Sequence, residues 1–165
     1  MSPQAHFSKI ALVIVAAFAV VLVGFSYYVR SLERGYDTEA IFPDGTRIMI
    51  GIAKTDEERA LGLSGRNQIG EKEGLYFLFP KEDRYGFWMK DMRFPIDIIW
   101  VRQGKIVGIE KNAAPEPDVP DYQLKVYSPP EPVSSVLEMN AGSADRFGLK
   151  AGDALKVQIV PRRRK

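Results

Sequence analysis

The sequence predicts a mainly β fold: a β-rich α+β domain, built as a small barrel or sandwich with two short helices and preceded by one transmembrane helix. Three features of the 165-residue chain support this prediction. Residues 10–29 form an apolar run without a charge. Residues 85–110 alternate with the period of two that is typical of strands. Helical start and stop signals occur near residues 55–65 and 140–148.

The apolar run at residues 10–29 predicts an anchor in the lipid bilayer. Twenty helical residues at about 1.5 Å each cross a hydrocarbon core of roughly 30 Å. A cleaved signal peptide is the alternative, but its apolar region usually has only about 7–15 residues. The predicted organisation is a tail (1–9), the anchor (10–29), a linker (30–37), a β-rich domain (38–161) and a basic tail (162–165).

The orientation of this anchor does not follow from its flanking charges. Lys9 precedes the run, whereas Arg30 and Arg34 follow it, so the positive-inside rule does not decide. A nine-residue tail before an anchor and a whole domain after it is the usual layout of a signal anchor. We therefore expect a single-pass protein of the inner or plasma membrane, with its domain on the extracytoplasmic (periplasmic) side.

Composition excludes several kinds of chemistry. The chain has no cysteine, and its one histidine, His6, precedes the predicted anchor. Disulfides, thiolate nucleophiles and a Ser-His-Asp triad are therefore excluded from the domain, and we predict no metal site. No phosphate-binding motif is present and we predict no cofactor. Residues 36–161 carry 16 basic and 20 acidic side chains, a net charge of −4, which argues against nucleic acid as a partner.

The first half of the domain predicts two strands, a helix and a third strand. The strands cover residues 39–42 and 46–53, around the turn tripeptide Pro43-Asp44-Gly45. Thr55 and Glu58 form a capping box that predicts a helix ending near Gly62 or Gly65. Residues 74–79 are an apolar strand that Pro80 ends, and residues 81–84 are predicted to be a charged loop.

The central part predicts three further strands. They cover residues 85–91, 96–102 and 105–110, and Gln103-Gly104 is the tight turn between the last two. In the middle strand Ile96, Ile98 and Trp100 face one way, and Asp97, Ile99 and Val101 face the other. Both faces are apolar, so we expect this strand to lie inside the sheet and to be covered on both sides.

The last part opens with a proline-rich segment. Six of the eleven prolines lie within residues 115–132, which excludes a helix there. This segment is either a lid at the rim of a binding site or a packed cover over a sheet face. Residues 133–139 then predict a strand, Asn140 the cap of a short helix at 141–147, and residues 154–160 the final strand.

Several of these stretches together resemble one known family. They are EERALGL at residues 57–63, GLYFLF at 74–79, FWMKDMRFPIDIIWV at 87–101, YSPP at 127–130 and VLEMNAGSADRFGLKAGD at 136–153. In this order they are similar to the bacterial and archaeal family called domain of unknown function 192. The resemblance covers roughly residues 39–160. It implies a compact β-rich domain and brings no established activity.

Carboxylates are the candidates for catalysis. Asp97 lies between apolar neighbours in its strand, Glu138 lies between Leu137 and Met139, and Lys90 could pair with Asp97. Two carboxylates about 5–9.5 Å apart could perform acid–base chemistry, on glycans for example. The alternative is structural: Asp97 holds the Pro95 turn through backbone N–H groups, while Lys90 or Arg93 satisfies Glu138. We favour the structural alternative, so the sequence argues against an enzyme more than for one.

The candidates for ligand contact are Trp88, Lys90, Arg66 and Tyr127. Trp88 neighbours Lys90 and is expected near the surface, where its ring could form a platform for a small molecule, a glycan or a protein. The sequence thus predicts a ligand-binding or accessory module of the cell envelope. The alternatives are a carboxylate-based enzyme that uses Asp97 and Glu138, and a structural domain that binds a partner. A cleft holding both carboxylates favours the enzyme, and an exposed Trp88 without paired carboxylates favours binding.

Overall fold

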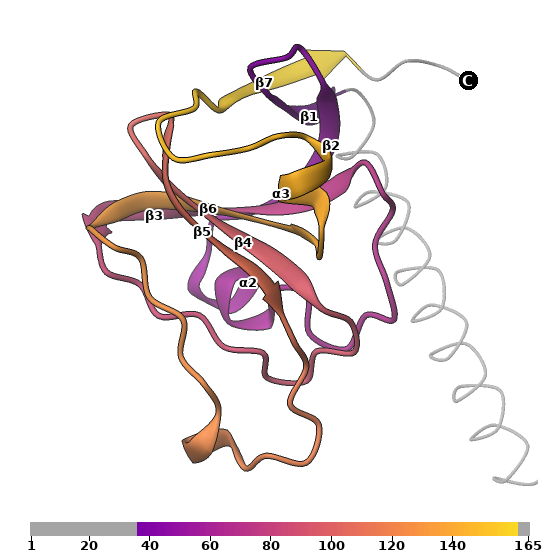
Figure 1. Ribbon diagram of the computed structural model, residues 1–165, viewed down its shortest axis with the longest axis vertical. Helices are drawn as coiled ribbons and strands as arrows, with labels where there is room; N and C mark the ends of the chain where they lie inside the picture. Colours follow the sequence, from indigo (N-terminus) through magenta and orange to yellow (C-terminus); the bar gives the residue numbers. More distant parts are fainter. Residues whose placement is uncertain (1–35, 162–165) are drawn as a thin grey trace, which may run out of the picture. The chain divides into compact units, whose positions relative to one another are not determined.

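The computed structural model describes residues 36–161, which form one seven-stranded mixed sheet with two short α-helices (Figure 1). The elements are β1 (Tyr36–Ile41), β2 (Arg47–Ala53), α2 (Asp56–Leu61), β3 (Glu73–Asp83), β4 (Ile96–Arg102), β5 (Lys105–Ala113), the 3-10 turn η1 (Asp121–Gln123), β6 (Val133–Asn140), α3 (Ser143–Arg146) and β7 (Lys156–Pro161). The predicted mainly β fold with two short helices is confirmed. The predicted anchor, residues 10–29, lies outside the described part. Within residues 36–161 no helix is long and apolar enough to cross a membrane.

The strands lie in the order β5-β4-β6-β3-β2-β1-β7. β2 and β3 pair in parallel, and the pairs β1–β2, β3–β6, β6–β4 and β4–β5 are antiparallel. Parallel neighbours need a crossover connection, and α2 lies on the connection from β2 to β3. The crossover therefore places α2 on one side of the sheet.

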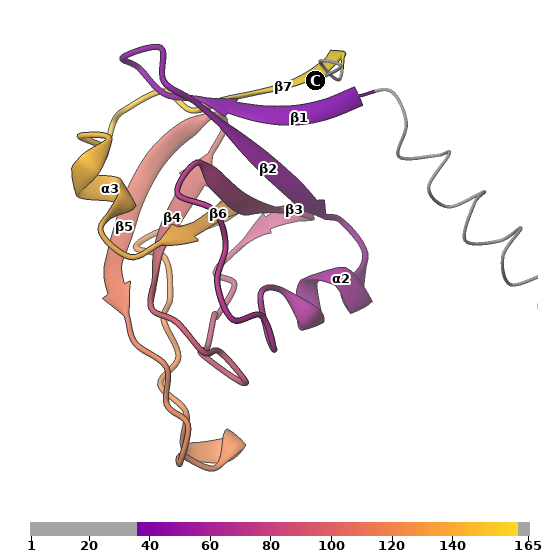
Figure 2. The ribbon, with the colours of Figure 1, turned by 90° about the vertical axis from the view of Figure 1, so that its right-hand side faces the viewer.

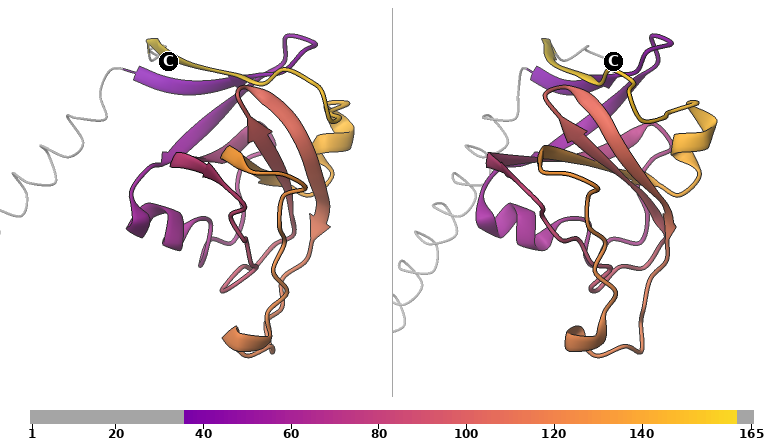
Figure 3. Two further views of the ribbon diagram at one scale, coloured as in Figure 1. Left: turned by 90° about the vertical axis from the view of Figure 1, so that its left-hand side faces the viewer. Right: turned by 60° about the vertical axis from the view of Figure 1, so that its left-hand side comes forward.

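The sheet curls so that the approach to β7 reaches the opposite edge strand. Lys105, at the start of β5, forms an isolated bridge with Ala154. The Leu155 amide also donates to the Gly104 carbonyl over 2.8 Å, and the Ile106 amide donates to the Asp153 carbonyl over 2.9 Å. Figure 3 shows β5 reaching the segment that leads into β7.

Each face of the central strands carries its own core. Ile98 lies opposite Glu138 and Asp97 opposite Met139 in the β4–β6 register, so neighbouring positions alternate between the faces. Figure 2 shows the two helices on opposite sides of these strands. The core on the side of α3 includes Ile48, Ile99, Val101, Leu137, Met139 and Ala144; the core on the side of α2 includes Leu63, Phe77, Met89, Ile98, Trp100 and Val136.

The β4–β5 hairpin has the structure that the sequence predicts. Six of the seven residues of β4 are buried, and the strand pairs with β5 on one side and β6 on the other. Gln103 and Gly104 both have positive φ, 49° and 74°, as a type I′ turn requires. The expected facing of Ile96, Ile98 and Trp100 against Asp97, Ile99 and Val101 is confirmed by the two cores.

Two predicted elements differ from the structure. Residues 85–91 are not a strand: Phe87 forms a single bridge with Tyr127, and the chain turns at Asp91, whose φ is 54°. A lone bridge cannot continue as a ladder once the chain turns away from its partner. Residues 81–83 are not a loop, because they extend β3 as far as Asp83, where it pairs with Val133 of β6.

The two helices begin at different kinds of cap. In α2 the Thr55 hydroxyl accepts from the Glu58 amide and the Glu58 carboxylate accepts from the Thr55 amide, so the predicted capping box is confirmed. In α3 the cap is Gly142 and not Asn140. Asn140 ends β6 instead, and its side-chain amide donates to the Ile69 and Gly70 carbonyls over 3.0 and 3.1 Å.

Candidate functional site

A cavity of about 250 Å³ opens on the α2 side of the sheet. α2 and the residues that follow it form one wall, the irregular segment 85–92 forms the other, and β3 and β6 contribute the floor. The lining residues are Arg59, Ala60, Leu61, Gly62, Leu63, Ser64, Phe77, Phe79, Tyr85, Gly86, Phe87, Trp88, Met92 and Glu138. The cavity is thus mostly aromatic and aliphatic, with few polar groups, as small-molecule sites usually are.

Aromatic rings build most of the wall and hold one another in place. The ring of Phe79 stacks on that of Tyr85 with centroids 3.6 Å apart. The Phe87 ring lies edge-on to the rings of Phe77 at 5.0 Å and Trp100 at 5.3 Å. The edge-on pairs of Phe87 are favourable ring geometries, and together with the stacked pair they form the wall without a ligand.

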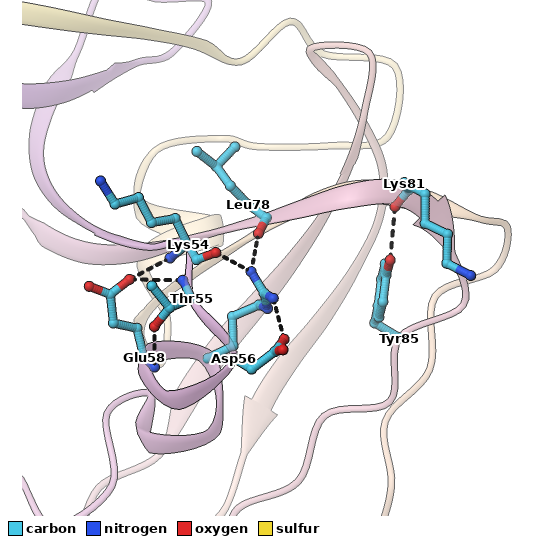
Figure 4. A network of polar contacts seen from close by, with 8 residues as sticks. Lys54, Thr55, Asp56, Glu58, Leu78, Lys81 and Tyr85 are labelled. Atoms are coloured by element: carbon cyan, nitrogen blue, oxygen red, sulfur yellow. Dashed lines mark hydrogen bonds and ion pairs between the residues drawn. The ribbon is translucent and has the colours of Figure 1, made fainter.

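Arg59 lines the cavity and links α2 to β3 through acceptors on Lys54, Asp56 and Leu78, the residues that Figure 4 labels. Its Nη1 donates to the Lys54 carbonyl over 2.6 Å and to the Leu78 carbonyl over 2.8 Å, and its Nη2 pairs with Asp56. Its guanidinium carbon also lies 5.4 Å from the centroid of the Phe79 ring. Figure 4 also shows the Tyr85 hydroxyl donating to the Lys81 carbonyl, away from the α2 contacts.

The rim of the cavity carries two exposed apolar side chains. Trp88 is 52% exposed and Leu61 is 64% exposed, although both line the cavity. The sequence placed Trp88 near the surface, and its exposure agrees with that expectation. An exposed indole at the mouth of a cavity can cover a ligand without taking part in the core.

Glu138 lies at the floor of this cavity. It faces Ile98 of β4 and Leu75 of β3 across the two ladders of β6, and only 5% of the residue is exposed. No group within residues 36–161 forms a hydrogen bond with the Glu138 carboxyl. In the same range, every side-chain oxygen that is completely shielded from solvent has a hydrogen-bond partner. The Glu138 carboxyl is therefore not completely shielded, and it opens into the cavity that it lines. Burial raises the pKa of the Glu138 carboxyl to about 8. The group is therefore mostly protonated at neutral pH in the empty cavity.

Asp97 lies on the opposite face of the sheet from Glu138. It is completely buried, and its two oxygens accept hydrogen bonds from the Asn112 amide over 2.9 Å and the Ala144 amide over 2.8 Å. These bonds tie β4 to the bulge near the end of β5 and to the first turn of α3. Asp97 accepts hydrogen bonds from backbone N–H groups, as the structural alternative predicts, but the donors are not those of the Pro95 turn. The structure therefore does not bring these two carboxyl groups together on one face of the sheet.

The other predicted partners of these carboxylates also lie elsewhere. Lys90 forms an ion pair with Asp121, which raises the pKa of Lys90, and does not reach Asp97 or Glu138. Arg93 donates to the Asn67 side chain over 2.8 Å. Neither cation satisfies Glu138, so the predicted ion pair between Glu138 and Lys90 or Arg93 is wrong.

The remaining ligand candidates do not line the cavity. Arg66 is exposed and lies in a separate shallow depression beside Ile69 and Glu73. Tyr127 is buried, exchanges two backbone hydrogen bonds with Phe87, and receives the Lys125 ammonium 4.1 Å from its ring centroid. Of the four candidates, only Trp88 belongs to this cavity.

The proline-rich segment 115–132 is partly a packed cover and partly a projecting tip. Leu124, Tyr127 and Pro129 are buried, whereas Tyr122 is 84% exposed. Figures 1 and 2 show η1 at the end of the domain that is remote from β1 and β7. The segment lies against one residue of the cavity lining, Gly86: a Cβ at Gly86 would be 2.7 Å from the Val126 side chain.

The sequence missed most of the cavity wall. Phe77, Phe79, Tyr85 and Met92 were not singled out as site residues, because apolar residues are normally core. Arg59 of α2 was not singled out either. The available signal was the concentration of aromatic residues between 76 and 88. Within residues 36–161, no three acidic, histidine or cysteine side chains lie close enough together to hold a metal ion.

Two comparisons, with family models and with solved structures, find relatives of this chain. The model of one family, DUF192 (Uncharacterized ACR), matches residues 40–157. A crystal structure from Novosphingobium aromaticivorans, of a protein of unknown function, is 32% identical, with a TM-score of 0.64 over 73% of this chain and 83% of that one. No curated protein matches the sequence significantly.

A second crystal structure, from Sinorhizobium meliloti 1021, is of a protein described as a candidate transcription regulator. It is 28% identical to this chain, with a TM-score of 0.65 over 74% of this chain and 93% of that one. Both solved structures have the fold described above.

Proposed function

The chain belongs to the family called domain of unknown function 192, and from that premise we propose that it is a small-molecule-binding module of the cell envelope, anchored in the membrane by residues 10–29. The observation that carries the proposal is the cavity of about 250 Å³ with a preformed aromatic wall and one open carboxyl at its floor. A cavity lined mostly by apolar residues, with a few polar groups, is a usual form of a ligand site.

Binding has more support than catalysis. The enzyme hypothesis needed Asp97 and Glu138 together, and these two side chains belong to opposite faces of the sheet. Glu138 has no second carboxylate or general base beside it among the residues that line the cavity. The hypothesis of a purely structural partner domain would rest on the exposed apolar side chains, which belong to several elements: Met49, Leu61, Leu78, Trp88, Tyr122, Val126, Val157 and Ile159.

Nucleic acid is not the ligand that we propose. The description of the Sinorhizobium meliloti relative concerns gene regulation by that protein. In this chain, residues 36–161 carry a net charge of −4, and a nucleic-acid site needs a basic surface.

Replacing Trp88 tests the binding proposal. A screen of small molecules by thermal shift on the full chain identifies compounds that raise its melting temperature, since a ligand stabilises the folded state by mass action. Trp88→Ala should weaken the binding of such a compound by roughly tenfold or more, as tryptophans at the mouth of a site often do. Tyr122→Ala is the matched control, because Tyr122 is an exposed aromatic residue outside the cavity. Equal effects of the two substitutions would count against this cavity.

The proposed location has a separate test. A reporter enzyme that is active only outside the cytoplasm, fused after Lys165, should be active in cells that express the full chain. The same fusion without residues 10–29 should be inactive, because the domain then lacks the apolar run that would take it to the membrane. Activity of a cytoplasm-dependent reporter in the full-length fusion would reverse the proposed orientation.

A further inference from the structure

We infer that the ligand of the cavity carries a positively charged ammonium group, which the Glu138 carboxylate and the surrounding aromatic rings bind together. This inference rests on the proposed function and names the chemical class of its ligand. It starts from the carboxyl at the floor. Glu138 is 95% buried and open to the cavity, and no group of residues 36–161 bonds to its carboxyl. A buried carboxyl without a partner is unfavourable, so a group that satisfies it gains that free energy on binding.

The walls favour the same kind of ligand. Aromatic faces carry negative electrostatic potential, and sites for quaternary ammonium ions are commonly built from several such rings. One cation already lies over a ring of the lining: the guanidinium carbon of Arg59 is 5.4 Å from the centroid of the Phe79 ring. The cavity adds the rings of Tyr85, Phe87 and Trp88.

Within residues 36–161, no basic side chain pairs with Glu138. Arg59 is the one basic residue of the lining, and two backbone carbonyls and Asp56 engage its guanidinium. Lys90, on the segment that forms the other wall, pairs with Asp121. The positive charge of Arg59 is therefore largely balanced locally, and the negative charge of an ionised Glu138 would have no counter-charge until a cationic ligand supplies one.

Binding of a cation to Glu138 is linked to a proton. The charged and titratable groups that face the cavity are Arg59 from α2, Tyr85 from the segment 85–92 and Glu138 itself from β6, while β3 and β4 present the apolar Phe77, Leu75 and Ile98 beside it. At neutral pH the empty site holds a protonated Glu138, so an ammonium ion that pairs with the carboxylate displaces one proton into the buffer. The apparent affinity should rise about tenfold per pH unit between pH 5 and 7, and level off above about pH 8.

Choline and its uncharged carbon isostere, 3,3-dimethylbutan-1-ol, provide a matched pair of probes. We would titrate both into the full chain, held in a choline-free detergent, by calorimetry in two buffers of different ionisation enthalpy. Choline should bind at least about tenfold more tightly than the isostere at pH 8, and should release close to one proton at pH 7. Glycerophosphocholine distinguishes a lipid headgroup from a free solute as the source: tighter binding than choline indicates the headgroup, and weaker binding the solute.

Glu138→Gln is the decisive variant, because it keeps the shape of the side chain and removes its charge. It should reduce the affinity for choline to that of the isostere and abolish proton release, while the isostere still binds. Glu57→Gln, which removes an exposed carboxylate of α2 outside the cavity lining, should change neither. Equal binding of choline and the isostere overturns the ammonium inference and leaves the proposed function intact. If neither the probes nor any compound of the screen binds, the proposed function itself is overturned.

Discussion

Two carboxyl groups are buried in the central strands β4 and β6, and they differ in their hydrogen-bond partners and in their access to a cavity. Asp97 on the α3 side is completely buried and accepts two backbone hydrogen bonds. Glu138 on the α2 side accepts none from residues 36–161 and is open to the aromatic cavity. The neighbouring strands provide both environments, because adjacent strand positions face opposite ways.

This difference separates a structural group from a candidate binding group. A buried carboxylate whose oxygens meet fixed N–H donors stabilises the fold and has no capacity left for a ligand. A buried carboxyl without hydrogen-bond donors is unfavourable in its ionised form. Such groups are found mostly at sites where a ligand or a reaction uses the carboxyl. Solvent exposure alone would not distinguish them, since both are almost completely buried.

Replacement of Asp97 should give the largest loss of stability. Asp97→Ala leaves the Asn112 and Ala144 amides without acceptors, at roughly 1–3 kcal/mol for each unsatisfied group. Asp97→Asn should fall between Ala and the wild type, because one amide oxygen can serve only one of the two donors. Urea denaturation of the three proteins measures these changes. An Asn variant as stable as the wild type would show that one of the two bonds contributes little.

Replacement of Glu138 should instead raise the free energy of unfolding at neutral and higher pH. The folded protein holds the Glu138 proton up to about pH 8, whereas an unfolded glutamate loses it near its ordinary pKa of 4.5. More protons are then bound in the folded state, so stability falls as pH rises through this window, by roughly 3 kcal/mol between pH 4.5 and 7. Glu138→Gln should remove this pH dependence.

The comparison that tests this is the difference in unfolding free energy between Glu138→Gln and the wild type at several pH values. We expect no difference near pH 4 and a more stable variant at pH 8. Asp97→Asn measured in parallel should not become more stable than the wild type at any pH. A difference that is constant from pH 4 to 8 would mean that Glu138 does not titrate in this range.

Replacement of Lys90 should have the smallest effect. Its partner Asp121 is exposed, and exposed ion pairs contribute little because solvent and salt screen them. Lys90→Gln should therefore leave the melting temperature unchanged within error, at both low and high salt. A loss of stability as large as that of Asp97→Asn would show that Lys90 supports one of the buried carboxylates after all.

Local patterns in the sequence predicted most of the elements. The capping box at Thr55 places α2, and the Gln103-Gly104 turn places the β4–β5 hairpin, because both signals act over a few residues. The sequence failed where a distant partner decides the structure. Residues 85–91 alternate like a strand, but they have only the single bridge with Tyr127 instead of a ladder.

The cavity was harder to predict for the same reason. Trp88 and Glu138 were both candidates, but they lie 50 positions apart, and their common site depends on the pairing of β3 with β6 and on the path of the segment 85–92. The aromatic residues of the wall read as core in the sequence. Their rings do pack together, and only the space left beside them distinguishes wall from core.

The sequence by itself determined the β-rich class, the alternation of β4, the charge of the domain and its lack of cysteine and histidine, because these depend on composition and on neighbouring residues. The tertiary structure decided which face each carboxylate meets and what lies there. Strand register puts Asp97 opposite Met139 and Glu138 opposite Ile98, and a shift of one residue would exchange their environments. Register is set by contacts between residues far apart in the chain, and so the difference between a structural and an open carboxyl appears only in the folded molecule.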